Sequence, residues 1–245
     1  MARSDGVVIV SENLWAFADR AGGLREGTMP ASPRLRRILF VRGLVRLAAA
    51  LSPLFRGTGV ASRRERLIVA AAVVSPFLLF VLPPALELTG WLAVTGGLLV
   101  WILRGRTLNL HGAEHRAIGA AEHRQLAATW AGDVRPSRFS LRCGTNFAAL
   151  VLPVSAFAEV LWPLPWTLWT PVAVTLVSLA LTMELWEAVQ GSRYSAVKGL
   201  LLPGLGLQRV TTREPSLEET RVALVAVASV LRRELGEGGE APVRP

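Results

Sequence analysis

Cysteine, histidine and lysine are scarce in this chain of 245 residues, which contains one cysteine, three histidines and a single lysine. Because Cys143 is alone, the chain forms no internal disulfide. A metal site built from three histidines at most must recruit other ligands as well. No signal peptide is expected either, because "VVIV" at residues 7–10 is too short for its apolar region.

Apolar residues are abundant, at 51% of the chain. They gather in four windows that are nearly free of charge: Leu67 to Leu86, Leu88 to Leu103, Cys143 to Trp162 and Pro171 to Ala188. Each window approaches the roughly 20 residues that a helix needs to cross a bilayer. The sequence therefore predicts an all-α, polytopic membrane protein with four transmembrane helices.

The positions of the basic residues support this topology. All 27 Lys and Arg residues lie before Leu67, between Arg104 and Arg142, or after Gln190. Positive residues concentrate on the cytoplasmic side of membrane proteins. We therefore expect both termini and the central loop in the cytoplasm.

The formal net charge of +9 also raises the question of nucleic acid. The arginines are spread over three separated segments and are not interleaved with aromatic residues, as a nucleic-acid surface requires. Anionic lipid headgroups are the partner that we expect for this charge. The sequence identifies no protein partner and leaves homo-oligomer formation open.

Outside the predicted spans, two further helices are expected. Leu35 to Phe55 is apolar but interrupted by arginines, which predicts a helix lying in the headgroup region. Ser216 to Leu235 begins with an S-x-x-E capping box, which predicts a cytoplasmic helix. The resulting division is a cytoplasmic arm with the interfacial helix (1–66), a first hairpin (67–103), a cytoplasmic loop (104–142), a second hairpin (143–188) and a cytoplasmic tail (189–245).

The central loop contains "HGAEH", in which His111 and His115 fall one helical turn apart on the same face. This H-x-x-E-H pattern is the inverted zincin motif, in which two histidines hold zinc and the glutamate acts as general base on water. Glu114 is the residue in that catalytic position. The alternative interpretation is a polar patch that solvates the end of a membrane helix.

Two histidines need at least one more ligand to hold zinc, and the predicted topology suggests where it comes from. Cys143 begins the third span at the cytoplasmic face, beside Arg142 and near a helix N-terminus, which favours its thiolate form. The fourth span returns to the same face with Glu184 and Glu187, and carboxylates within apolar spans usually mark a function. Inert packing is the alternative for Cys143.

These segments together resemble the YqhQ-like family of bacterial membrane proteins, a family of unknown function often labelled as predicted metal-dependent enzymes. The matching segments run in order from "FVRGL" through "HGAEHRAIGAAEH", "SRFSLRCGTNF", "TMELW" and "LPGLGLQ" to "TTREPS". The resemblance implies four spans and a cytoplasmic polar cluster with a suspected metal site. The matching site positions are His111, Glu114, His115, Glu122, Arg142, Cys143, Gly144 and Glu184.

The chain also departs from the pattern of this family. Ser140 and Leu141 stand where the family usually has a histidine and a proline, and Ala120 stands where a cysteine often follows the histidine pair. The family's glycine-rich opening is shortened to "GGLREGTM", which retains Glu26 and its following glycine. If the replaced residues are ligands in relatives, the metal preference of this chain differs.

With the bacterial membrane localisation that the resemblance implies, the leading hypothesis is a polytopic inner-membrane protein that binds a divalent transition metal at its cytoplasmic face. We expect the metal to be zinc, with iron and manganese as alternatives. In its enzymatic form, His111 and His115 ligate, Glu184 or Cys143 completes the site, and Glu114 serves as base for hydrolysis of a membrane-associated substrate. The competing hypothesis is a non-catalytic membrane scaffold in which the same residues form a structural metal or polar site. Transport is less favoured, because the first two spans carry almost no charge.

Overall fold

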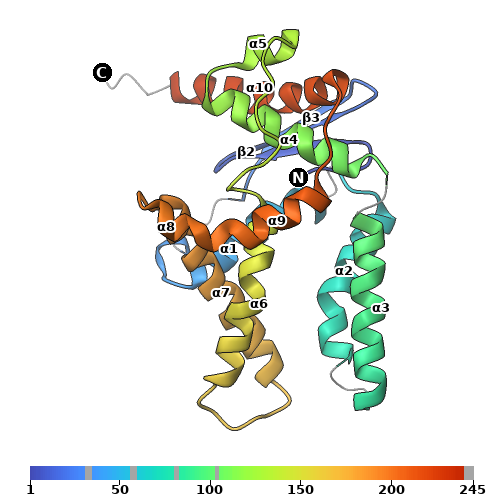
Figure 1. Ribbon diagram of the computed structural model, residues 1–245, viewed down its shortest axis with the longest axis vertical. Helices are drawn as coiled ribbons and strands as arrows, with labels where there is room; N and C mark the ends of the chain where they lie inside the picture. Colours follow the sequence, from blue (N-terminus) through green and yellow to red (C-terminus); the bar gives the residue numbers. More distant parts are fainter. Residues whose placement is uncertain (31–34, 56–59, 80–82, 103–104, 240–245) are drawn as a thin grey trace, which may run out of the picture.

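The computed structural model describes residues 1–30, 35–55, 60–79, 83–102 and 105–239. The chain is mostly helical (Figure 1), as the sequence predicts. The all-α prediction is nevertheless wrong at the N-terminus, where a small antiparallel sheet forms in the order β1, β2, β3. Its strands are β1 (Gly6–Val10), β2 (Leu14–Asp19) and β3 (Leu24–Thr28).

Both faces of β1 and β2 are buried, so their sequences lack the alternation of apolar and polar residues that would predict a strand. One face, with Val7 and Ala16, packs in a core with α4 (Thr107–Glu122) and α10 (Leu217–Gly239). The opposite face, with Val8 and Phe17, belongs to a second cluster that includes Ala49 and Val60. The first part of the predicted cytoplasmic arm is therefore a sheet packed into the body of the protein.

The segment predicted as one interfacial helix is divided into a short 3-10 helix, η1 (Leu35–Arg37), and α1 (Val41–Phe55). Phe40 separates them with a φ of 66°, a left-handed conformation that no helix continues through. Helix α1 packs along α7 (Thr170–Gly191). Arg42 and Arg46 of α1 form ion pairs with Glu184 and Glu187 of α7.

Two helical hairpins extend to the same side of the body formed by the sheet, α4 and α10 (Figure 1). The first consists of α2 (Arg63–Leu79) and α3 (Pro84–Ile102). The second consists of α6 (Gly144–Val160) and α7. They coincide with the two predicted membrane hairpins.

Four transmembrane helices are not supported. Among the described residues, α7 is the one helix both long and apolar enough to cross a membrane. The apolar part of α2 begins only at Leu67, after three arginines and a glutamate, so it spans about 20 Å to Leu79. Helix α6 is apolar but has 17 residues, which gives about 25 Å.

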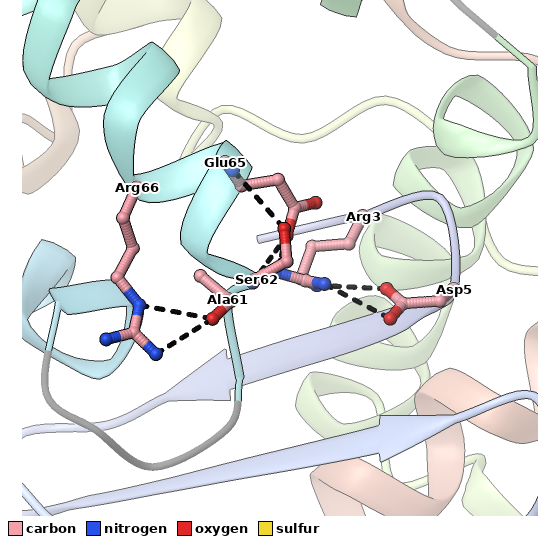
Figure 2. A network of polar contacts seen from close by, with 6 residues as sticks. All are labelled: Arg3, Asp5, Ala61, Ser62, Glu65 and Arg66. Carbon is pink, nitrogen blue, oxygen red and sulfur yellow. Dashed lines mark hydrogen bonds and ion pairs between the residues drawn. The ribbon is translucent and has the colours of Figure 1, made fainter.

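A polar network joins the sheet to the start of α2 (Figure 2). Ser62 and Glu65 form a reciprocal capping box, in which the Ser62 N–H donates to Glu65 at 2.8 Å and the Glu65 N–H donates to the Ser62 hydroxyl at 3.2 Å. Arg3, beside β1, lies 3.0 Å from the same Glu65 carboxylate. The first hairpin is thus tied to the sheet at its base.

The remaining helices close the body around the central loop. Helix α4 is followed by the short helix α5 (Leu126–Ala131), and Arg124, with a φ of 57°, separates the two. The tail contains α8 (Ser195–Lys198), the 3-10 helix η2 (Gly199–Leu201), α9 (Leu202–Thr211) and α10. The capping box of α10 is confirmed. The Ser216 N–H donates to the Glu219 carboxylate at 2.9 Å, and the Glu219 N–H donates to the Ser216 hydroxyl at 3.2 Å.

Candidate metal centre

His111 and His115 lie one turn apart on α4, with ring centroids 4.5 Å apart. Each ring directs Nδ1 at a backbone carbonyl oxygen, that of Thr211 for His111 (2.8 Å) and that of Arg138 for His115 (2.7 Å). Because a carbonyl oxygen only accepts, Nδ1 carries the hydrogen in both rings. A neutral ring then has its lone pair on Nε2, the arrangement typical of a metal-ligating histidine.

Cys143 completes the cluster from the start of α6. Its Sγ lies 3.2 Å from His111 Nε2, and it also accepts hydrogen bonds from the Thr145 N–H and hydroxyl. Burial alone would raise the pKa of the Cys143 thiol, but hydrogen bonds and charge from His111 and His115 lower it to about 5. The sulfur is therefore a thiolate at neutral pH, which is the form that binds metal.

The pKa of His111 is also shifted by its surroundings. Burial would lower its pKa, but the hydrogen bond with Cys143 and the charges of Glu114 and Cys143 outweigh burial and raise it. Without a cation, the two shifts favour an imidazolium paired with a thiolate. A bound cation would replace the proton between nitrogen and sulfur.

The three donor atoms fit one metal ion. One ligand atom each from His111, His115 and Cys143 lies within 4.8 Å of the others. Two imidazoles and a thiolate are ligands that zinc takes in proteins. The sequence prediction that these residues converge is confirmed in geometry, and the group contains Cys143 and no carboxylate.

Glu114 lies beside the cluster but faces the N-terminus. Its Oε1 is 2.6 Å from the Met1 ammonium nitrogen, whereas its Oε2 is buried without a hydrogen-bond partner among the described residues. Burial would raise the pKa of Glu114, but the charges of the ammonium group, His111 and His115 lower it. Glu114 is therefore ionised at neutral pH.

The glutamates of α7 occupy a different place. The Glu184 carboxylate accepts a hydrogen bond from Arg42 Nε at 2.8 Å and one from the Phe40 N–H at 3.3 Å. Glu187 pairs with Arg46. Both carboxylates thus fix α1 to α7, and neither belongs to the His and Cys group.

The other predicted polar residues are also dispersed. Glu122 forms an ion pair of 2.9 Å with Arg142 on the surface. Gly144 is the first residue of α6, and Glu26 of β3 accepts a hydrogen bond from Ser229 of α10. None of them belongs to the group formed by His111, His115 and Cys143, and Glu26 instead links β3 to α10.

No pattern in the sequence predicts the hydrogen-bond network that holds the loop before Cys143. The fully buried Gln208 of α9 accepts a hydrogen bond from the Ser140 N–H at 2.9 Å and donates one to the Ser140 carbonyl at 2.8 Å. Asn146 of α6 donates to the carbonyls of Ser140 and Leu141. The segments "LPGLGLQ" and "CGTNF" carried these residues, but only the fold pairs them.

Gly112, inside the "HGAEH" motif, has a role of its own. A Cβ at this position would overlap the carbonyl oxygen of Arg213. The Arg213 N–H in turn donates to the Leu108 carbonyl at 2.9 Å, so the chain after α9 lies directly on α4. Glycine permits this approach, which brings the Thr211 carbonyl within reach of His111.

Comparison with known proteins places this centre in a recognised sequence family. The family "Protein of unknown function (DUF1385)" matches residues 98–233, which include all three residues of the cluster. The "Uncharacterized protein YqhQ" of Bacillus subtilis (strain 168) is 34% identical over 143 residues, or 56% of this chain and 44% of that protein. The match therefore spans less than half the length of this relative. No solved structure matches the chain.

Proposed function

Because the chain belongs to the DUF1385 family, whose function is unknown, we propose a function from its own residues: it is a membrane protein that binds zinc through His111, His115 and Cys143. We further propose that this site hydrolyses a membrane-associated substrate. The observation that supports zinc most directly is that both imidazoles donate Nδ1–H to carbonyls and so offer Nε2 near a thiolate.

A zinc ion held by three protein ligands would keep a fourth coordination position for water or substrate. Sites with three protein ligands are typical of catalytic zinc, which supplies Lewis acidity, whereas structural sites usually have four. Glu114 is ionised and close enough to interact electrostatically with both histidines, so it has the charge state to accept a proton from water. We propose that Glu114 acts as the general base on that water.

A structural metal site is the second candidate, and burial favours it. His115 is 4% exposed and Cys143 is 7% exposed, which leaves little of the cluster open to solvent. A metal there would join α4 to α6 and to the Arg138 loop without any reaction. The two candidates differ in whether an external ligand reaches the ion.

Cobalt substitution separates these possibilities. Metal-free protein loaded with Co²⁺ should develop a thiolate charge-transfer band that Cys143→Ser removes and Glu184→Gln preserves. If Glu184→Gln abolishes cobalt binding and Cys143→Ser does not, the ligand assignment is wrong. Added azide should change the visible spectrum of an open catalytic site and leave a closed structural site unchanged.

Membrane insertion through both hairpins is the third part of the proposal. It is supported by the apolar helix α7, by the common direction of the hairpins in Figure 1, and by the outward-facing apolar residues of α6 such as Leu152 and Phe157. The basic residues all lie outside the hairpin tips. We propose four crossings of the inner membrane, with both termini cytoplasmic and anionic headgroups against the arginines.

Labelling with a membrane-impermeant maleimide tests this topology in a Cys143→Ser background. Leu164→Cys, in the exposed α6–α7 connection, should react in intact bacterial cells. The matched cytoplasmic variant Ser195→Cys should react only after lysis. Equal protection of both positions would contradict the proposed crossing of the second hairpin.

A further inference from the structure

A pocket of about 600 Å³ opens beside the metal centre, within the usual range for small-molecule sites. It lies between the C-terminal part of α4, the loop that follows α5, the end of α7 and the segment from α8 to η2. Its polar lining includes His115, Glu122, Arg135, Arg142, Gln190 and Lys198.

The charges around this pocket are unbalanced. Arg135, Arg142 and Lys198 face a single carboxylate, that of Glu122, which pairs with Arg142 at 2.9 Å. Neither Arg135 nor Lys198 has an ion-pair partner in the described part of the chain. Three cations against one carboxylate leave two positive charges, which matches the charge of a phosphate monoester.

The pocket also contains an unused hydrogen-bond donor. Gln190 lines it near the end of α7, and its buried Nε2 has no partner among the described residues. Buried amide groups normally find an acceptor, so an unpaired one beside unpaired cations favours an acceptor-rich ligand. Ile118 and Phe139 supply an apolar wall, which strengthens charge-assisted bonds by excluding water.

The position of the pocket relates it to the proposed site. His115 belongs both to the pocket lining and to the metal cluster, and Arg142 directly precedes Cys143. Gln190 stands one residue before the end of the candidate membrane helix, so the pocket lies at the base of the second hairpin. A ligand here would touch the centre from the headgroup side.

We propose that this pocket binds a phosphate group, held by Arg135 and Lys198. The assignment of that ligand as the substrate of a hydrolase rests on the proposed function; the binding itself does not. The phosphate belongs either to a monoester lipid headgroup, such as that of phosphatidic acid, or to a soluble phosphate monoester, since both present three terminal oxygens and about two negative charges.

Calorimetric titration of detergent-purified, metal-free protein tests the proposal, with inorganic phosphate and glycerol 3-phosphate as soluble probes. Arg135→Gln/Lys198→Gln should weaken binding by at least about tenfold, because both charge-assisted bonds are lost. The matched control is Arg20→Gln/Arg232→Gln, which removes two exposed charges outside the pocket and should bind as wild type. A second arm uses nanodiscs of phosphatidic acid or phosphatidylcholine to reveal whether a lipid supplies the phosphate.

Metal content and phosphate binding, measured on the same variants, test the zinc site and the phosphate pocket separately. His111→Ala should lose metal in the protein as purified and should still bind phosphate after metal removal, because His111 does not line the pocket. Wild-type protein that contains no metal as purified, before any chelator treatment, but still binds phosphate would refute the proposed zinc site and leave the phosphate pocket supported. The pocket is refuted if wild type binds neither soluble probe nor phosphatidic acid, or if the double pocket variant binds as tightly as wild type.

Discussion

Removing His111 should change the ionisation of Cys143 more than any other property of the metal-free protein. With a pKa of about 5, the thiol is roughly 99% thiolate at pH 7, whereas a thiol at the ordinary 9.0 is about 1% thiolate. The lowered value depends on the two histidines, because burial acts in the opposite direction. His111→Ala removes the 3.2 Å contact and its charge, so the pKa should rise and the thiolate fraction at pH 7 should fall.

The assay is the rate of iodoacetamide alkylation against pH, read by intact-protein mass spectrometry after treatment with a chelator. The chain has one cysteine, so each added group reports Cys143. Because the wild-type pKa is lowered, its rate should stay at the plateau as the pH falls through neutrality and decline only near pH 5. In His111→Ala the decline should begin at higher pH.

His123→Ala provides the matched control. His123 is the remaining histidine, it is exposed, and its Nδ1 bonds to the Gly119 carbonyl at 2.8 Å outside the cluster. Its removal should leave the alkylation profile unchanged. A wild-type midpoint near 9, or a midpoint that His111→Ala does not move, would refute the assigned pairing of imidazole and thiolate.

Three further predictions concern stability, measured by thermal unfolding in detergent. Gly112→Ala should destabilise by about 2 kcal/mol, because its Cβ overlaps the Arg213 carbonyl, whereas Gly119→Ala meets only ordinary contact and should be neutral or slightly stabilising. Gln208→Leu should cost about 2 kcal/mol and alter Cys143 reactivity, since it leaves buried polar groups of the loop unpaired. Ser216→Ala should cost about 1 kcal/mol through loss of the α10 cap, without affecting metal content. Equal effects of the two glycine variants, or a Gln208→Leu protein as stable as wild type, would contradict the contacts described.

The sequence was informative where function depends on local spacing. The four-residue separation of His111 and His115 predicted one helical face, and α4 places both rings together. The apolar windows predicted both hairpins, so Cys143 was expected at the same face as the histidines. Its convergence with them followed from topology and is confirmed by the geometry.

The sequence was uninformative where contacts join residues that are distant in the chain. It was also uninformative where a strand is buried on both faces and therefore lacks an alternating pattern. Strands buried on both faces show no alternation of apolar and polar residues, so the sequence predicts an all-α fold and misses β1 and β2. Glu184 had the expected placement for a third ligand, but Arg42, far away in the sequence, occupies its carboxylate. Such a pairing depends on the packing of α1 against α7, which no local pattern encodes.

Metal content tests the central claim most directly. Protein purified in detergent without added chelator should be analysed by inductively coupled plasma mass spectrometry, with wild type beside His111→Ala/His115→Ala and His123→Ala. We predict near-stoichiometric zinc in wild type and in His123→Ala, and its loss in the double variant. Empty wild-type protein after growth in zinc-supplemented medium, or zinc retained by the double variant, would contradict a metal centre at His111, His115 and Cys143.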